Sequence, residues 1–380
     1  MTFKSARLNR FSWALVCLLG IASVAHACSV PVFRYALERW PADKFEAIVF
    51  HRGPLSTEHQ ALIERINSSD NAANIVAEAV DLDANKDEEL HKVWETFGTK
   101  SLPGVLLFYP RTARIPVPPW SGPLDEEAVN TAMDSPARRQ IARRLIKGET
   151  AVWVFLEIGD KAVDDAAFKR LEGELKVQQN KIKLAEIDEA DLAQGLLLLD
   201  PAELKVKFST LRVSREDAKE KIFIDMLLGT ESDLRDLKEP MAFPIFGRGR
   251  ALYALIGKGI NAETVAQAGT DLTGPCTCTI KDQNPGTDML MSVAWDTLIE
   301  PFVEVEKELP PLKGLGGFGP EDETASNETD PAEDISETAQ VSETKSAAAG
   351  GSLTFSVLIA CGILFSVVVV GSVALSLKTS

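Results

Sequence analysis

The sequence predicts an α/β protein made of two similar units. Short apolar runs of strand length alternate with longer segments in which apolar residues recur every three or four positions, the pattern of amphipathic helices. This alternation begins near residue 43 and begins again at Glu149, so one arrangement of elements is expected twice. The chain of 380 residues is long enough for two such domains and several accessory segments.

The composition excludes one class of partner. Apolar residues make up 45% of the chain and charged residues 25%, which is ordinary for a globular protein. The formal net charge is −16, so we expect no nucleic-acid partner, because its phosphate groups would be repelled. Much of the excess negative charge lies in one tract, residues 321–343, and it therefore says little about the folded part.

Residues 1–27 are typical of a secretory signal peptide. Basic residues precede an apolar run at 11–22, and Ala25-His26-Ala27 is an A-x-A cleavage site. The apolar run is too short to span a membrane. Cleavage leaves Cys28 as the first mature residue. A lipidated Cys28 is the alternative interpretation, although Ala25 stands where lipoproteins usually carry leucine.

The opposite end of the chain predicts a membrane anchor. Residues 353–377 form an uncharged apolar run that is long enough to cross about 30 Å of hydrocarbon as a helix. Residues 378–380 are then a cytoplasmic stub, and the body lies on the extracytoplasmic (periplasmic) side of the cytoplasmic membrane. Residues 310–352 are rich in small and acidic residues, so we expect a disordered acidic linker there.

The first unit is expected over residues 28–147. It starts with an N-terminal arm, 28–40, whose short helix we expect to pack on this same unit. Ser56 is the expected N-cap of the first helix after the arm. The strands are expected at 46–51, 75–81, 105–109 and 115–120, and the helices at 56–67, 88–97, 125–134 and 135–145.

The second unit is expected over residues 148–309, including an extension that contains the sequence Cys276-Thr277-Cys278. The apolar residues 289–295 are expected to dock back on this unit. The strands are expected at 151–158, 183–188, 207–213, 245–246 and 252–256, the helices at 164–180, 215–228 and 261–269, and a leucine-rich helix or loop at 190–201.

The turn after the first strand carries the most specific signal. His51-Arg52-Gly53-Pro54 joins an apolar strand directly to a helix, and the order of elements around it resembles that of thioredoxin-like domains, whose turn reads Trp-Cys-Gly-Pro-Cys. The Gly-Pro is retained and both cysteines are absent. Leu102-Pro103 matches the cis-proline position of that family, and Phe243-Pro244 takes the same place in the second half. The resemblance implies two tandem thioredoxin-like domains, each a three-layer α/β/α arrangement, without the paired-cysteine site.

The resemblance also implies a binding site. Relatives hold extended peptides in a groove beside the cis-proline, and the corresponding residues here are His51, Arg52, Leu102 and Pro103. Independently, the unpaired N–H groups of a helix N-terminus favour an anion, so Arg52 could hold a carboxylate or phosphate with His51 as a titratable partner. In the alternative interpretation, Gly53-Pro54 only builds the turn.

Three cysteines are candidate redox or metal residues, since Cys28, Cys276 and Cys278 are expected in an oxidising compartment. One structural disulfide could tie Cys28 to the segment after the second unit. A Cys276–Cys278 disulfide would close a small strained ring, and strained disulfides are readily reduced. Thiolate and thioether ligands also suit Cu(I), so Met289 and Met291 beside these two cysteines complete a candidate copper site.

These features favour a non-catalytic, membrane-tethered extracytoplasmic binding or scaffold protein with a protein or peptide partner and no resident cofactor. The alternative is a thiol–disulfide oxidoreductase or copper-handling protein that uses Cys276 and Cys278 with Cys28. The stretch CSVPVFRYALERW at 28–40 also resembles the start of the mature part of exported, membrane-anchored proteins of planctomycete-type bacteria, which implies no particular activity.

Overall fold

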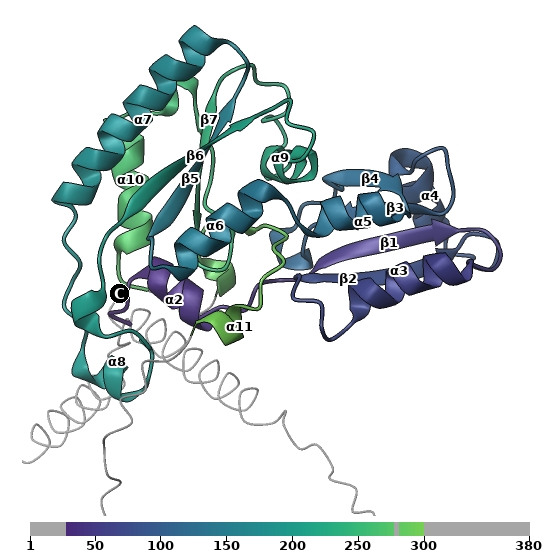
Figure 1. The fold of residues 1–380 in the computed structure, drawn as a ribbon, viewed down its shortest axis with the longest axis horizontal. Helices are drawn as coiled ribbons and strands as arrows, with labels where there is room; N and C mark the ends of the chain where they lie inside the picture. Colours follow the sequence, from purple (N-terminus) through teal and green to yellow (C-terminus); the bar gives the residue numbers. More distant parts are fainter. Residues whose placement is uncertain (1–27, 277–280, 300–380) are drawn as a thin grey trace, which may run out of the picture. The chain divides into compact units, whose positions relative to one another are not determined.

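Two β-sheets with helices against their faces organise the protein. The computed structural model describes residues 28–276 and 281–299 (Figure 1). The predicted signal peptide 1–27, Cys278, the predicted linker 310–352 and the predicted span with its stub, 353–380, lie outside the described residues. Within the described ranges, no helix has both the length and the apolar character needed to cross a membrane.

The first unit is built around a four-stranded sheet. Its elements are β1 (Phe45–His51), α3 (Thr57–Asn67), β2 (Ile75–Asp81), α4 (Glu88–Phe97), β3 (Gly104–Phe108), the short helix η1 (Arg111–Ala113), β4 (Trp120–Pro123) and α5 (Glu126–Met133). The strand order is β2-β1-β3-β4. β1 and β2 run parallel, whereas β3 runs antiparallel to β1 and β4 runs antiparallel to β3.

Local sequence explains the central strand and the helix after it. β1 reads FEAIVFH, and its alternate residues face opposite sides of the sheet, so that Ala47 and Val49 enter one core and Phe50 enters the other. Ser56 caps α3 as expected, because its Oγ accepts the N–H of His59 at 3.2 Å.

The outer edge of β2 is covered by a side chain. Asn67, the last residue of α3, accepts the N–H of Ala77 with Oδ1 and donates from Nδ2 to the Ala77 carbonyl, each at 2.8 Å. One amide side chain therefore satisfies both backbone groups that Ala77 presents at this edge.

The second unit is built around a larger sheet. Its elements are α6 (Pro136–Ile146), β5 (Ala151–Glu157), α7 (Lys161–Lys181), α8 (Glu189–Ala193), η2 (Pro201–Glu203), β6 (Phe208–Ser214), α9 (Lys221–Leu228), β7 (Met241–Phe246), β8 (Arg250–Ala251), β9 (Leu255–Ile256), η3 (Gly257–Gly259), α10 (Ala262–Thr273), η4 (Lys281–Gln283), β10 (Thr287–Asp288) and α11 (Trp295–Leu298). The order is β10-β8-β7-β5-β6, and β9 also pairs with β7. β5 runs parallel to β6 and antiparallel to β7, and β7 runs antiparallel to β8. The strands β6-β5-β7-β8 thus repeat the order and directions of β2-β1-β3-β4.

Two predicted strands are wrong. Residues 183–188 alternate apolar and polar side chains, yet they run as irregular chain between α7 and α8. Alternation shows that a segment can be half-buried, but it supplies no neighbouring strand. The strand expected at 115–120 begins only at Trp120, because Pro116, Pro118 and Pro119 lack the N–H group that a ladder needs.

The N-terminal arm packs on the second unit, and the expectation that it packs on the first is wrong. Helix α2 (Val32–Arg39) lies in one apolar cluster with Trp153 and Phe155 of β5. Just before this helix, the Val30 carbonyl accepts the N–H of Cys276 at 2.9 Å. The sequence shows that α2 has an apolar side, but the pattern is equally suited to either sheet.

One hydrophobic core extends from the first sheet to the second. It contains Ala47 and Val49 of β1, Ile141 and Leu145 of α6, and Val154 of β5. The opposite face of each sheet has a cluster of its own, covered by α4 in the first unit and by α2, α7 and α10 in the second. Each sheet is therefore buried on both faces, and the two units share a core.

The segment after η4 touches both units. β10 pairs with β8 of the second sheet. Asn74, which directly precedes β2, donates from Nδ2 to the Met289 carbonyl at 3.2 Å and accepts the N–H of Met291 with Oδ1 at 2.7 Å. The docking expected for 289–295 therefore involves the first unit as well as the second.

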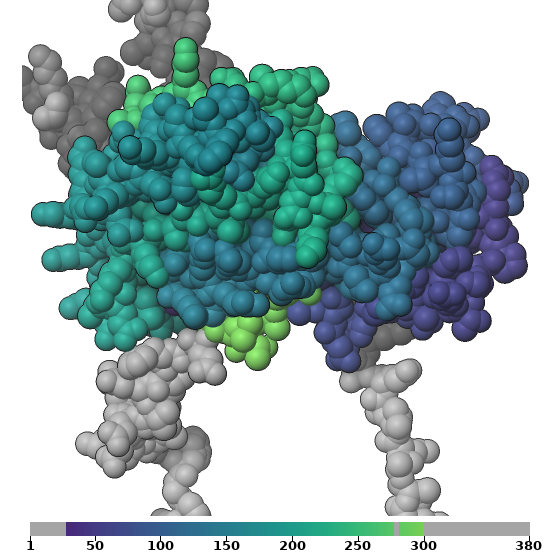
Figure 2. Space-filling model, turned by 45° about the horizontal axis from the view of Figure 1, so that its top comes forward, coloured from purple at the N-terminus to yellow at the C-terminus, as the bar shows by residue number. Residues whose placement is uncertain are grey.

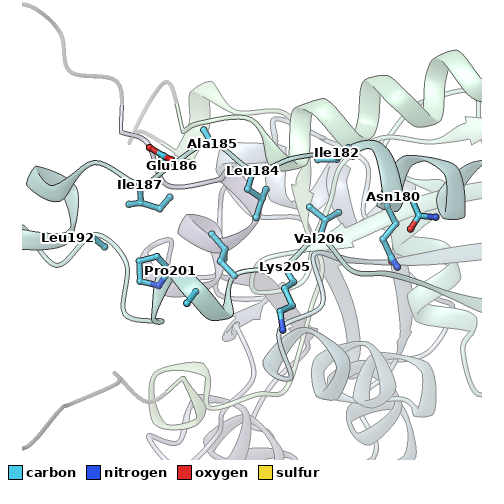
Figure 3. Close-up of a pocket in the computed structure, with 13 residues that line it drawn as sticks. Asn180, Ile182, Leu184, Ala185, Glu186, Ile187, Leu192, Pro201, Lys205 and Val206 are labelled. Carbon is cyan, nitrogen blue, oxygen red and sulfur yellow. The ribbon is translucent and has the colours of Figure 1, made fainter.

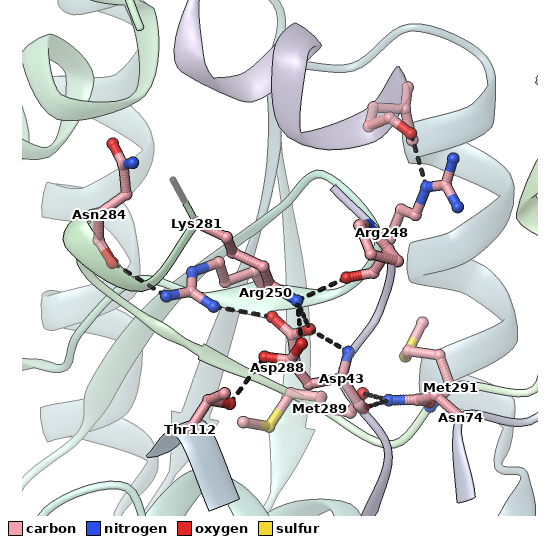
Figure 4. Close-up of polar contacts among 12 residues, drawn as sticks. Asp43, Asn74, Thr112, Arg248, Arg250, Lys281, Asn284, Asp288, Met289 and Met291 are labelled. Atoms are coloured by element: carbon pink, nitrogen blue, oxygen red, sulfur yellow. Dashed lines mark hydrogen bonds and ion pairs between the residues drawn. The ribbon is translucent and has the colours of Figure 1, made fainter. Parts of the chain in front are cut away.

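A buried ion cluster fixes the same junction (Figure 4). Asp288 of β10 is 4% exposed, and its Oδ1 lies 2.9 Å from Nη1 of Arg250. Lys281 pairs with Asp288 and, at 3.0 Å, with Oδ1 of Asp43. The N–H of Asp43 also donates to Oδ2 of Asp288 at 2.8 Å. The charges of two acids and two bases cancel in this cluster. We therefore assign it a structural role where the chain enters β1.

Candidate functional site

The predicted turn lies where β1 meets α3. His51 is the last residue of β1, and α3 begins at Thr57. Gly53 between them has φ of 63°, a conformation that residues with a Cβ rarely adopt, so glycine is needed at this point of the turn.

The cis-proline position lies beside this turn. The Leu102–Pro103 peptide bond is cis, and it is the only cis bond within residues 28–276 and 281–299. Gly104, directly after it, pairs with Phe50 in the antiparallel β1–β3 ladder. The next residues along the two chains, His51 and Pro103, therefore lie opposite each other. The structure thus brings the two predicted stretches to one end of the first sheet.

Acidic side chains surround the turn. Asp81, at the end of β2, accepts the N–H of Asp83 at 2.9 Å and that of Gly53 at 3.3 Å. The hydrogen bond from Asp83 is the main reason that the pKa of Asp81 lies below its ordinary value. Arg52 forms an ion pair with Asp83, and their side chains are 56% and 55% exposed. The guanidinium expected to meet an anion is therefore already paired with a carboxylate.

His51 is held by its own turn. Its Nδ1 lies 2.8 Å from the carbonyl oxygen of Gly53. This contact requires that Nδ1 carries a proton and donates it to the carbonyl. The ring is thereby oriented by the backbone of its own turn.

Trp94 of α4 supports the chain before β3. Its ring packs on Phe50, with 5.1 Å between the ring centroids. A Cβ built on Gly104 would lie 2.4 Å from Cη2 of Trp94, so glycine is required there. Leu102, by contrast, is 36% exposed. The helical pattern places Trp94 on the inner face of α4, but nothing in the sequence places it beside the proline.

The second unit also has a proline at the equivalent place, but the assignment of Phe243-Pro244 to it is wrong. These two residues lie in the interior of β7. Met241 is the last paired residue of the β5–β7 ladder, and Pro240 directly precedes it, just as Pro103 precedes the last paired residue of β3. The apolar run of β7 continues through Pro244, so the sequence pattern suits either proline. Strand pairing alone shows that Pro240, four residues earlier, is the equivalent of Pro103.

The turn of the second unit is filled by its own side chains. Asp164 is 2% exposed and accepts the N–H groups of Ile158 and Gly159, each at 3.0 Å. Arg215 donates to the Leu237 carbonyl at 2.8 Å, close to the proline of this unit in sequence, and burial lowers the pKa of Arg215. The backbone groups that would meet a ligand at this turn are therefore bonded internally.

Cys28 and Cys276 lie in two segments that are joined by a backbone hydrogen bond. Both are buried in the cluster under α2, at 5% and 1% exposure, and Cys276 pairs with Val30, two residues from Cys28. No disulfide joins them in the part of the chain that the structure describes. Burial raises the pKa of the Cys28 thiol, which opposes formation of the thiolate needed for exchange or metal binding.

The candidate copper ligands lie in different parts of the interior. Met289 and Met291 are 0% and 1% exposed in the core shared by the two units, whereas Cys276 belongs to the cluster under α2. The fourth candidate, Cys278, lies outside the described residues. Cys276 thus lies in a different apolar cluster from Met289 and Met291, and the copper site expected from Cys276, Cys278, Met289 and Met291 stays a prediction.

The irregular chain before β6 lines a cavity of about 870 Å³ (Figure 3). Leu184 and Ile187 come from one stretch of this chain, and Pro201 and Lys205 come from the other. The strand-like pattern at 183–188 hid this cavity from sequence prediction, because a strand there would have paired with a neighbour instead.

Comparison with known proteins gives no relative from which a site could be transferred: no protein-family model matches the chain, and no curated protein matches it.

Proposed function

We propose that this protein is a non-catalytic binding or scaffold protein with two tandem thioredoxin-like units. Its first unit binds an extended peptide at the turn His51-Arg52-Gly53-Pro54 and the adjacent Leu102-Pro103. The equal strand orders and directions of β2-β1-β3-β4 and β6-β5-β7-β8 support the tandem arrangement. The pairing of Phe50 with Gly104, which sets His51 opposite Pro103, supports the position of the site.

The observation that carries the proposal is the difference between the two turns. In the second unit, the buried Asp164 takes up the N–H groups of Ile158 and Gly159. In the first unit, Leu102 is 36% exposed and Arg52 is 56% exposed at the corresponding end of the sheet. The N–H groups of the second turn are therefore engaged by a buried carboxylate of their own unit, whereas the first turn presents one exposed apolar and one exposed charged side chain to a partner.

The charges at the first turn indicate what kind of peptide it accepts. Arg52 and Asp83 already neutralise each other, so a charged residue of either sign would have to separate this pair. The exposed Leu102 favours an apolar side chain instead. An extended, uncharged and apolar peptide segment fits this surface best.

The absence of thiols at the turn supports a non-catalytic role. Disulfide exchange proceeds through attack by a thiolate, and positions 51–55 read His-Arg-Gly-Pro-Leu. Cys28 and Cys276 are buried under α2 on the second unit.

The proposed location is the outer face of the cytoplasmic membrane, and it rests on the signal-like residues 1–27 and the apolar run 353–377. The full chain should sediment with membranes, whereas a chain ending at residue 352 should be released to the extracytoplasmic fraction. Continued sedimentation of the shortened chain would contradict the anchor.

The binding site is tested with an array of unstructured apolar peptides probed with the full-length protein in detergent. The peptide that binds most tightly is then titrated against Leu102→Ser, which should weaken binding about tenfold, or about 1.4 kcal/mol. Val163→Ser is the matched control, because Val163 is exposed in the first turn of α7 beside the second, filled turn. Unchanged binding to Leu102→Ser, or equal loss in both variants, would exclude the site.

A further inference from the structure

A second hollow lies where the described chain ends. A cavity of about 460 Å³ is bordered by α2, by the end of α6 and by residues 199–207. Its remaining border is formed by Leu298 and Ile299, which are 51% and 9% exposed. Figure 2 shows the light-green residues near the end of the described chain at the molecular surface. The chain therefore continues from the rim of this cavity.

The cavity combines an apolar floor with a basic rim. Phe33 and Leu37 of α2 are buried in its lining, at 3% exposure each. Lys147 and Lys205 are exposed lining residues, and neither has an ion-pair partner among residues 28–276 and 281–299. A third lining lysine, Lys207, is paired with Glu149 at 3.1 Å. The hollow thus offers apolar contact and a rim on which the two lysines without an ion pair among the described residues outnumber one exposed carboxylate, that of Glu203.

The sequence that follows Ile299 has the complementary character. It reads Glu300-Pro301-Phe302-Val303-Glu304-Val305-Glu306, which combines a phenylalanine and two valines with three glutamates. At about 3.3 Å per residue, a segment of this length can extend about 20 Å from Ile299. Since it is joined to the rim, its effective concentration at the cavity is of millimolar order, well above that of a separate ligand.

We propose that residues 300–306 of this chain occupy the cavity. Phe302 and the two valines cover the floor formed by α2, and Glu304 and Glu306 neutralise Lys147 and Lys205. This contact fixes the point from which the acidic linker leaves the folded body. It also shields two lysines that would otherwise attract anionic surfaces.

Hydrogen exchange of the full chain in detergent, read by mass spectrometry, tests this contact. Amides of 302–306 should exchange at least tenfold more slowly than amides of the acidic tract 321–343 in the same molecule. The double variant Lys147→Glu/Lys205→Glu should remove that protection. Adding Glu304→Lys/Glu306→Lys to the double variant should restore it by reversing both charges.

Matched controls separate this contact from general effects. Lys86→Glu/Lys100→Glu makes the same charge change at two exposed lysines of the first unit and should leave the protection intact. Near-ultraviolet circular dichroism checks that each variant is folded, and Phe302→Ser, which leaves both lysines in place, should also lower the protection.

Three results would overturn the proposal. The first is exchange of 302–306 in the unaltered chain at the rate of the acidic tract. The second is protection that survives Lys147→Glu/Lys205→Glu, and the third is a charge-reversed variant that fails to recover it. Vesicles of phosphatidylcholine and phosphatidylglycerol test whether lipid is the occupant instead. If the chain binds these vesicles through Lys147 and Lys205 while the amides of 302–306 are unprotected, the surface is assigned to lipid.

Discussion

The turns after β1 and β5 occupy the same position in their sheets, yet different groups satisfy their backbone. In the second turn, the buried Asp164 accepts the N–H groups of Ile158 and Gly159. In the first turn, Asp81 lies on a neighbouring strand and reaches Gly53 only at 3.3 Å, while Arg52 remains exposed. The comparison teaches that one arrangement of strands can satisfy the backbone of this turn in two ways, with a buried carboxylate from the helix that follows the turn or with a carboxylate from the neighbouring strand.

Opening the second turn should have the largest effect on stability. Asp164→Ala removes the acceptor of two N–H groups at a buried position, so the free energy of unfolding should fall by about 2–4 kcal/mol in urea denaturation. Asp160→Ala, which removes the N-cap of α7 beside it, should cost about 1 kcal/mol. If Asp164→Ala costs no more than Asp160→Ala, the second turn is not closed by this carboxylate.

Adding a side chain next to Pro103 should have the next largest effect on stability. Gly104→Ala places a Cβ against Trp94 and should lower the free energy of unfolding by about 1–3 kcal/mol. The cost should shrink when Trp94→Ala is already present, as a double-mutant cycle would show. Gly173→Ala, within α7 and with open space around the new Cβ, should instead be stabilising by about 0.5–1 kcal/mol. An equal cost of Gly104→Ala in both backgrounds would contradict the contact.

The first turn should contribute an acid-sensitive part of the stability. The pKa of Asp81 is lower in the folded state than in the unfolded chain, so its contribution is fully present above about pH 4–5 and is lost as pH falls through the folded pKa. The stability difference between the unaltered protein and Asp81→Asn should therefore be constant near neutral pH and shrink in acid. Urea denaturation from pH 3 to 7 measures this difference, and growth of the difference toward acid would refute the assignment.

The packing of the arm on the second unit should be detectable in the reactivity of the Cys28 thiol, with the smallest expected effect of the four predictions. Because Cys28 is buried and its pKa is raised, a maleimide should label it at least about tenfold more slowly in the native protein than in urea. The rates are read by mass spectrometry of the peptide that contains Cys28. Fast native labelling would show that the arm leaves the second sheet.

Local signals in the sequence were sufficient for much of the fold. The helix expected at 88–97 has these limits in the structure, and Ser56 caps α3. Both depend on residues within one or two helical turns. The choice of Pro240 over Pro244 depends on strand register, and the position of α2 depends on which sheet has an uncovered face. Neither of these is encoded in a short stretch of sequence.

The local parts of the candidate site were likewise predictable from the sequence, and its long-range contacts were not. The turn at His51 and the proline at Pro103 stand out in the sequence, and the ladder brings them to one sheet end. The groups that decide accessibility come from other elements: Asp83 from the chain after β2, Trp94 from α4, and Asp164 in the other unit. Ion pairs and ring contacts between distant residues leave no periodic pattern, so sequence reasoning did not find them.

The two hydrogen bonds of Asn67 have a consequence for the behaviour of this protein at high concentration. An incoming chain that tried to extend the first sheet at β2 would find both backbone groups of Ala77 already engaged. That edge is thereby protected against strand addition, the usual beginning of ordered aggregation. A sheet whose edge strand is engaged by a side chain of its own unit can in this way avoid polymerising along that side.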